Sequence, residues 1–210
     1  MDLLTRLYLI RHGEVEPAYH KVFGGRIDMN LSDLGHQQVR ALAKFLHAAP
    51  PDVLYASPMR RVQQTLAPLA EQTGLQPILM EGLREVDFGA WTGLSWDDVQ
   101  KRHGVSAFTW LNQLEDGTID RAETVREFRK RVEVSLDQIL AEAPGKTVAV
   151  ICHGGVIRML LSILFDMPFR KMSMFEIEYA SVTKIHYRPS KREIEFLNLT
   201  PWRDYPQCPT

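Results

Sequence analysis

The hydrophobic positions of this chain form short runs that are separated by longer amphipathic stretches. Continuous apolar runs are typical of buried strands, whereas strict alternation indicates half-buried antiparallel strands. The continuous runs are residues 6–10, 52–57, 76–80 and 147–152, and the alternating ones are 181–187 and 192–199. We therefore expect about six strands.

Helical patterns lie between these runs. Ser32 can cap a helix with an apolar face. Ser57 and Pro58 resemble a cap followed by a proline at the first helical position, and Pro68 is expected to bend or shorten that helix. A third helix is expected from Glu123 to about Ala141. This alternation predicts an α/β fold, a three-layer α/β/α sandwich around a mainly parallel sheet.

Residues 88–123 fit this alternation poorly. They contain three of the four tryptophans, Trp91, Trp96 and Trp110, together with Phe108. Two interpretations stay open: the segment covers the carboxyl edge of the sheet as a lid, or it forms a satellite core under a long connection. We expect one domain over residues 1–210, with this insertion inside it.

The composition excludes several classes of protein. The chain has 210 residues, 45% of them hydrophobic and 24% charged, with a net charge of −1. This balance argues against a nucleic-acid partner. No run approaches the roughly 18 apolar residues of a membrane span, so we expect no membrane partner and a cytoplasmic location. Cys152 and Cys208 suggest no disulfide framework, and Cys208 is expected to be exposed in a proline-rich tail.

Polar residues of complementary chemistry follow the predicted strands. Arg11 and His12 end the first strand, Arg61 follows the second, Glu85 follows the third, and His153 ends the fourth. Ligands of open α/β sheets bind beyond the carboxyl ends of the strands. Guanidinium groups bind phosphate oxygens, and a neutral imidazole can attack phosphorus. The sequence therefore favours phosphate chemistry without a metal or another cofactor.

Four segments carry a family resemblance. They are RHGE at 11–14, SPMRRVQQT at 57–65, LREVDFGAWTG at 83–93 and CHGG at 152–155. In this order they resemble the motifs of the histidine phosphatase superfamily, which includes cofactor-dependent phosphoglycerate mutases, broad-specificity phosphatases and α-ribazole phosphatases. The resemblance extends from about residue 7 to about 165 and implies a phosphoglycerate mutase-like fold.

The resemblance also implies residue roles. His12 would be the nucleophile and form a phosphohistidine, and Glu85 would be the general acid for the leaving alcohol and then the base for water. Asp87 lies close enough in sequence to take that acid role instead. The phosphate-binding residues would be Arg11, His12, Arg61 and His153. Substrate would also contact Phe23, Gly24 and Glu85.

The expected function is hydrolysis of a small phosphomonoester. The segment 88–123 carries six carboxylates against three lysines or arginines, which disfavours the multiply charged substrate of a mutase. Its aromatic residues suggest a bulky, partly apolar leaving group, and the motifs LREVDFGAWTG at 83–93 and VREFRKRV at 125–132 look like those of α-ribazole phosphatases. Mutase-type phosphoryl transfer and non-catalytic binding of a phosphorylated ligand remain alternatives.

Two further features have competing interpretations. Cys152 and Arg158 have the spacing of a cysteine-dependent phosphatase loop, but the apolar run before Cys152 predicts a buried strand residue, and we expect Arg158 to lie one turn too deep in the helix. The segment DMPFRKMSMF at 166–175 suggests a possible homodimer surface, although internal packing also explains it.

Overall fold

The computed structural model of the protein describes residues 2–205 and contains a six-stranded sheet. The strand order is β3-β2-β4-β1-β5-β6. The strands are β1 (Thr5–Arg11), β2 (Val53–Ala56), β3 (Ile78–Leu79), β4 (Thr147–Cys152), β5 (Val182–Arg188) and β6 (Lys191–Leu199). Strands β1, β2, β3 and β4 run parallel to one another, whereas β5 runs antiparallel to both of its neighbours, β1 and β6. The predicted α/β fold with a mainly parallel sheet is confirmed.

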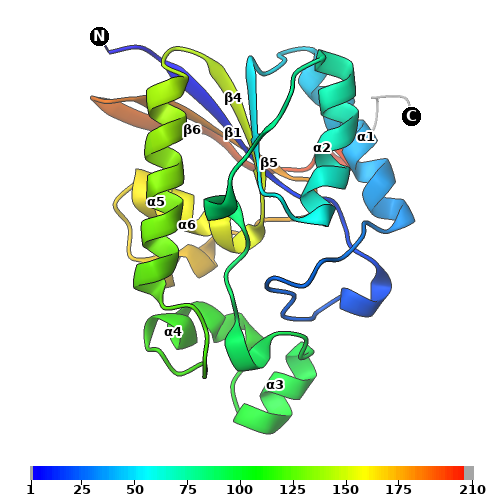
Figure 1. The fold of residues 1–210 in the computed structure, drawn as a ribbon, viewed down its shortest axis with the longest axis vertical. Helices are drawn as coiled ribbons and strands as arrows, with labels where there is room; N and C mark the ends of the chain where they lie inside the picture. The colour runs from blue at the N-terminus through cyan, green and yellow to red at the C-terminus, as the bar shows by residue number, and fades with distance from the viewer. Residues whose placement is uncertain (1, 206–210) are drawn as a thin grey trace.

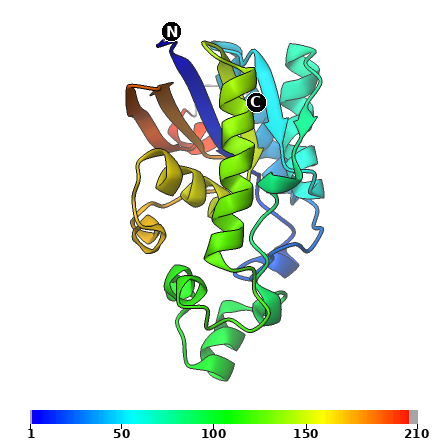
Figure 2. The ribbon, with the colours of Figure 1, turned by 60° about the vertical axis from the view of Figure 1, so that its left-hand side comes forward.

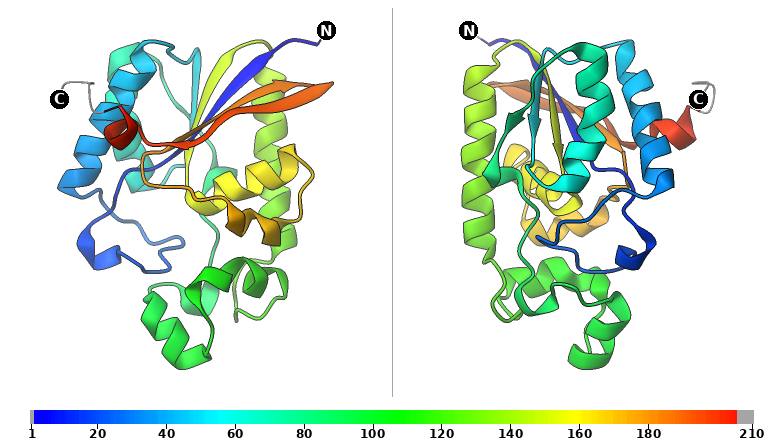
Figure 3. Two further views of the ribbon diagram at one scale, coloured as in Figure 1. Left: turned by 180° about the vertical axis from the view of Figure 1, so that it is seen from behind. Right: turned by 45° about the vertical axis from the view of Figure 1, so that its right-hand side comes forward.

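Helices cover both faces of the sheet. The α-helices are α1 (Asp33–His47), α2 (Arg60–Thr73), α3 (Trp96–His103), α4 (Trp110–Glu115), α5 (Val125–Glu142), α6 (Gly154–Leu164) and α7 (Pro201–Asp204). The 3₁₀ helices are η1 (Pro17–Tyr19), η2 (Glu81–Leu83), η3 (Gly89–Trp91), η4 (Ala107–Thr109) and η5 (Phe169–Met174). Figure 3 shows α5 on one side of the sheet and α1 and α2 on the other.

The alternation of side chains along β1 explains these layers, because successive strand residues point to opposite faces. Tyr8 and Ile10 belong to the buried cluster formed with α1 and α2. Leu7 and Leu9 belong to the cluster formed with α5 and α6. Each face of the central strands is therefore buried, as expected for parallel strands covered by helices.

Helix starts depend on single polar side chains. Ser32 caps α1 as expected, since its side chain accepts a hydrogen bond from the Gly35 amide. Thr124 caps α5 in a capping box with Glu127, so this helix begins two residues later than the sequence pattern predicts. The hydroxyl and the carboxylate together satisfy amides that the first turn leaves unpaired.

The cap predicted at Ser57 is wrong. Helix α2 begins at Arg60, and no side chain caps it. The Ser57 hydroxyl instead lies 2.9 Å from His153 Nε2, so the site at the sheet edge uses it. Pro68 lies inside α2, which continues to Thr73, so it does not end the helix, and the bend expected there stays a prediction.

The segment 88–123 projects from the end of the molecule opposite the N-terminus (Figures 1 and 2). It contains η3, α3, η4 and α4. Its buried residues Trp91, Leu111 and Leu114 belong to the same hydrophobic cluster as α5 and α6. The segment is therefore anchored to the main core and does not form a separate cluster.

The remaining expectations concern a homodimer, the second cysteine, membrane spans and metal ligands. Phe169 and Met172 are buried, whereas most of the 166–175 segment, Met174 included, is exposed, and a homodimer stays a prediction. Cys208 lies outside the described residues. Within residues 2–205, no helix is long and apolar enough to cross a bilayer, and no group of histidine, cysteine or acidic side chains could hold a metal ion.

Candidate active site

The ends of β1, β2 and β4 meet at one edge of the sheet. The His12 amide donates to the Cys152 carbonyl at 3.1 Å, and the Ser57 amide donates to the Ile151 carbonyl at 3.0 Å. A cavity of about 660 Å³ opens beside these ends. Six of the seven predicted site residues line it: Arg11, His12, Phe23, Gly24, Arg61 and Glu85.

His12 lies at the floor of this cavity. Its Nδ1 is 2.8 Å from the Gly13 carbonyl, which can only accept, so Nδ1 carries the proton. Its Nε2 is 3.2 Å from Arg61 Nε and accepts from it. Burial, then Arg61 and Arg11, hold the pKa of His12 well below its ordinary value of 6.5. The ring is therefore neutral at physiological pH, with a lone pair on Nε2.

Arg61 holds both histidines and the loop after β1. Its Nε–H is shared between His12 Nε2 and His153 Nδ1, each at 3.2 Å. Its two Nη groups donate to the carbonyls of Ile27 and Gly25 at 2.8 and 3.0 Å. Burial lowers the pKa of Arg61 to about 10, so the guanidinium remains charged at neutral pH.

His153 is fully buried behind Arg61 and does not line the cavity. Its Nδ1 accepts from Arg61, so the proton of the neutral ring is on Nε2, facing Ser57 Oγ at 2.9 Å. Burial and the nearby Arg61 keep its pKa well below 6.5. The ring centres of His12 and His153 are 5.3 Å apart. His153 thus orients Arg61, and its direct contact with phosphate stays a prediction.

Arg11 approaches the cavity from the other side of His12. Its Nη1 donates to the Ile177 carbonyl at 2.6 Å, and its guanidinium carbon lies 3.9 Å from the centre of the Tyr179 ring. The Arg11 Nε–H is buried and has no partner within the described residues. Because a buried donor without an acceptor is costly, this group is suited to an anionic ligand.

The Glu85 carboxylate faces the cavity from the loop after η2. Its Oε2 accepts from the Gly155 amide at 3.1 Å, and its Oε1 accepts from the Val86 amide at 3.0 Å. A Cβ on Gly155 would overlap Glu85 Oε1, so any larger residue there would displace the carboxylate. Asp87, the competing candidate for the acid, bonds to the Gly89 amide and does not line the cavity.

Aromatic side chains of the segment 88–123 form the cavity mouth. Trp96, Phe108 and Trp110 line it, and the Phe108 side chain is 74% exposed. Trp91 is buried instead and packs against Phe23. The lid interpretation therefore describes the aromatics that face the cavity, whereas Trp91 joins the main core and not a satellite core.

Sequence reasoning misplaced Arg158. The residue is not too deep in α6 to reach the site, since it lines the cavity and donates to the Phe175 carbonyl at 3.0 Å. It lies one helical turn after Gly154, and that spacing could have placed it correctly. Cys152 is fully buried in the core, and burial raises the pKa of its thiol, which disfavours the thiolate that a cysteine-dependent phosphatase needs.

The charge of the cavity has a different source from the one expected. None of the carboxylates within the segment 88–123 lines it; Glu123, for example, pairs with Arg131. Four other carboxylates do, against three guanidiniums: Glu14, Glu85, Glu176 and Glu178 against Arg11, Arg61 and Arg158. The acidic residues of the segment 88–123 therefore do not act on the cavity as expected; Glu176 and Glu178 reach it from the segment before β5, and Glu178 also pairs with Arg203.

Comparison with known proteins agrees with this geometry. Residues 7–200 match the family described as the histidine phosphatase superfamily, branch 1. The chain belongs to this superfamily. It is 27% identical to phosphoserine phosphatase 1 of Hydrogenobacter thermophilus, over 94% of this chain and 93% of that protein. It is 25% identical to the adenosylcobalamin/α-ribazole phosphatase of Salmonella typhimurium, over 82% and 86%.

A solved structure described as mycobacterial hydrolase 1 has the same fold. It superposes with a TM-score of 0.84 at 25% identity and covers 94% of this chain and 99% of that one. The expected superfamily and the assignment as an enzyme of the histidine phosphatase type are confirmed.

Proposed function

We propose that this histidine phosphatase hydrolyses phosphomonoesters through a phosphohistidine on His12 Nε2. The observation that carries the proposal is the neutral His12 ring, whose lone pair faces Arg61 in a cavity lined by Glu85. A nucleophile, fixed cations and a proton donor are the parts that transfer of a phosphoryl group to a histidine needs.

The first step transfers the phosphoryl group. Nε2 attacks phosphorus, the P–N bond forms, and the P–O bond to the leaving alcohol breaks. Arg11 and Arg61 stabilise the charge on the phosphoryl oxygens, and protonated Glu85 gives its proton to the leaving oxygen. In the second step Glu85 takes a proton from water, which attacks phosphorus and releases inorganic phosphate and His12.

Rapid-quench labelling with a radiolabelled phosphomonoester tests this route. We expect a phosphoenzyme that is stable in base, labile in acid and absent from His12→Ala. Acid-stable label on the protein would contradict a phosphohistidine. Binding of phosphate without any turnover in the wild-type protein would instead favour the non-catalytic alternative.

The cavity mouth supports a bulky, partly apolar leaving group. Three exposed apolar side chains from separate segments line the same cavity: Leu34, Phe108 and Met174, at 41%, 74% and 64% exposure. Exposed apolar residues that gather at one opening indicate a binding surface. A nucleoside-like or aryl alcohol would cover them. Equal kcat/KM values for naphthyl phosphate and small sugar phosphates would remove this support.

Mutase-type transfer is the second candidate function. It requires cations for a second phosphate and a carboxylate, whereas beyond Arg11 and Arg61 the described cavity lining adds only one guanidinium, that of Arg158. Assays with 3-phosphoglycerate and a bisphosphate primer compare isomerisation with release of inorganic phosphate. We expect release to dominate, and faster isomerisation would overturn the assignment to hydrolysis.

A further inference from the structure

The position of Glu85 depends on a loop without regular structure. The residue lies between η2 and η3, and within residues 2–205 its carboxylate accepts hydrogen bonds only from the amides of Val86 and Gly155. General acid catalysis requires the carboxyl group to be within hydrogen-bond reach of the leaving oxygen. Something must therefore fix the backbone of this loop.

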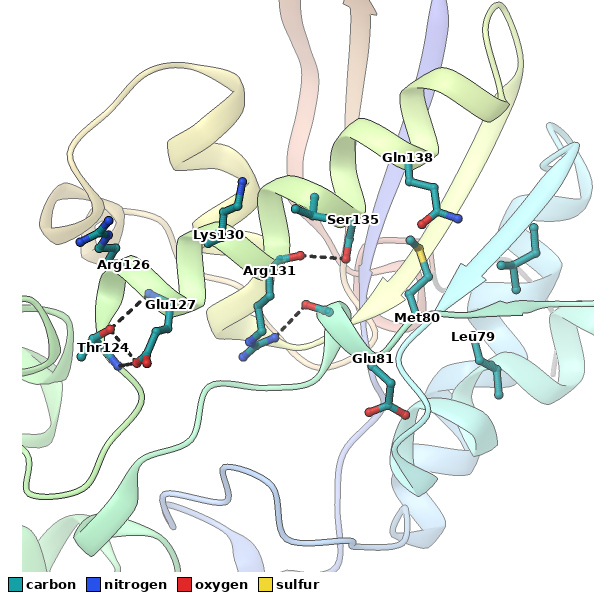
Figure 4. A pocket seen from close by; sticks show the side chains of 13 residues that line it. Leu79, Met80, Glu81, Thr124, Arg126, Glu127, Lys130, Arg131, Ser135 and Gln138 are labelled. Atoms are coloured by element: carbon teal, nitrogen blue, oxygen red, sulfur yellow. Dashed lines mark hydrogen bonds between the residues drawn. The ribbon is translucent and has the colours of Figure 1, made fainter.

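Arg131 of α5 contacts this backbone directly. Its Nη1 donates to the carbonyls of Gly82 and Arg84 at 2.8 and 2.6 Å, and its Nη2 donates to the Glu85 carbonyl at 3.1 Å. In Figure 4 the Arg131 side chain points from α5 toward the backbone beside Glu81, and a dashed line marks one of these bonds. Three backbone carbonyls of this loop thus converge on one guanidinium.

The other edge of the guanidinium is held equally firmly. Arg131 Nε and Nη2 donate to the two oxygens of Glu123 at 2.6 and 2.8 Å. The Glu123 side chain is only 8% exposed, and it also accepts from the Asp87 amide at 3.3 Å. A guanidinium has five N–H donors, and all five of Arg131 have an acceptor here.

We infer that Arg131 is a positioning residue for Glu85: held by Glu123, it fixes the backbone of residues 82–85 and so places the carboxyl group at the leaving oxygen. This inference rests on the proposed role of Glu85. Lysine cannot replace the guanidinium, because an ammonium has three donors and no planar fork. Arg131→Lys should keep the charge and release part of the loop.

The leaving group distinguishes this role from a structural one. An alkyl alcohol needs a proton as it departs, whereas p-nitrophenolate leaves without one. Displacement of Glu85 should therefore lower kcat/KM for an alkyl phosphate more than for p-nitrophenyl phosphate. Loss of folded protein would lower both equally. The ratio of the two kcat/KM values, which report the first phosphoryl transfer, is the readout.

The experiment compares Arg131→Lys with Glu85→Gln and with Arg126→Lys, an exposed arginine on the same helix. We expect Glu85→Gln to lower kcat/KM for phenethyl phosphate by about 100-fold and Arg131→Lys by about 10-fold, each with less than about 3-fold loss on p-nitrophenyl phosphate. Arg126→Lys should change neither. The thermal midpoint of each variant reports folding.

Two outcomes would overturn the inference, and they are distinguishable. If Glu85→Gln loses activity equally on both substrates, Glu85 is not the general acid and the proposed mechanism fails with the inference. If Glu85→Gln shows the selective loss, but Arg131→Lys lowers kcat/KM for both substrates equally or for neither, only the positioning role is wrong. Should Arg131→Lys fail to fold, Glu123→Gln, which leaves the arginine in place, must show the same selective loss in smaller degree.

Discussion

The two ends of the cavity are built differently. At the phosphate end, His12, Arg61 and His153 form one hydrogen-bonded chain on the ends of β1 and β4 and the start of α2, and every ring nitrogen has a partner. At the mouth, Phe108 and Met174 are largely exposed and come from connecting segments.

This difference separates chemistry from specificity. Groups on rigid elements can be held at the short distances that bond making requires, whereas connecting segments can vary without disturbing them. We therefore expect changes at the phosphate end to lower turnover of every substrate. Changes at the mouth should instead alter the ranking of substrates.

The largest effect is expected from His12→Ala. Without the imidazole no P–N bond can form, so turnover should fall on the order of 10⁵-fold for every substrate. Steady-state release of inorganic phosphate from p-nitrophenyl and naphthyl phosphates measures this. A loss restricted to one of them would break the separation of the two ends.

A smaller loss is expected from Gly155→Ala. The new Cβ would overlap Glu85 Oε1 and displace the carboxylate, for which we expect a loss of about 10- to 100-fold in kcat/KM on alkyl phosphates. Gly154→Ala is the matched comparison, since its Cβ comes no closer than 3.3 Å to Arg158 Nη1. Equal losses in the two variants would show that contact with Glu85 is not the cause.

At the mouth, Phe108→Ala should act on selected substrates. Removing the ring should lower kcat/KM for naphthyl phosphate by about 3- to 10-fold, equivalent to about 0.5–1.5 kcal/mol, and leave small sugar phosphates unchanged. Leu79→Ala, at an exposed apolar residue on β3, controls for general surface effects. Equal losses on both substrate classes would place Phe108 in the chemistry instead of the specificity.

The sequence predicted the phosphate end better than the mouth for a physical reason. Strand ends are set by apolar periodicity, and parallel strands bring their ends to one edge, so Arg11, His12 and His153 could be placed from the pattern alone. The role of the Ser57 hydroxyl could not be predicted in this way, because a serine before a proline has the pattern of a helix cap. Only the fold shows that His153 lies within reach of it.

Long-range contacts explain the other differences. The pairing of Arg131 with the loop at 82–85 joins residues almost 50 positions apart, and no periodicity encodes it. The same holds for Glu176 and Glu178, which line the cavity from a segment that the sequence pattern left without a role. The carboxylates of the segment 88–123 could be counted but not oriented, so the expected charge effect was attributed to the wrong residues.

Acid should destabilise the folded protein through the buried histidines of the phosphate end. The pKa of His153 is lowered in the folded protein, so below pH 6.5 the unfolded chain binds a proton that the folded protein excludes. The free energy of unfolding should therefore fall as pH drops below 6.5, by up to about 1.4 kcal/mol per pH unit for this histidine. Urea unfolding between pH 7 and 5 measures the slope. Because the pKa of His12 is also lowered, His153→Gln should reduce the slope without abolishing it, and His103→Gln, at an exposed histidine of α3, should leave it unchanged.

The smallest effect on activity is expected from Cys152→Ser, although this residue adjoins His153. Its side chain belongs to the core formed with α5 and α6, on the face of the sheet away from α1 and α2. The serine hydroxyl would be buried there, so we expect about 1–3 kcal/mol of destabilisation but less than about 3-fold change in kcat/KM below the melting transition, because no step uses the thiol. If Cys152→Ser lost the phosphoenzyme while His12→Ala kept it, the nucleophile would be Cys152 in the core and not His12 in the cavity.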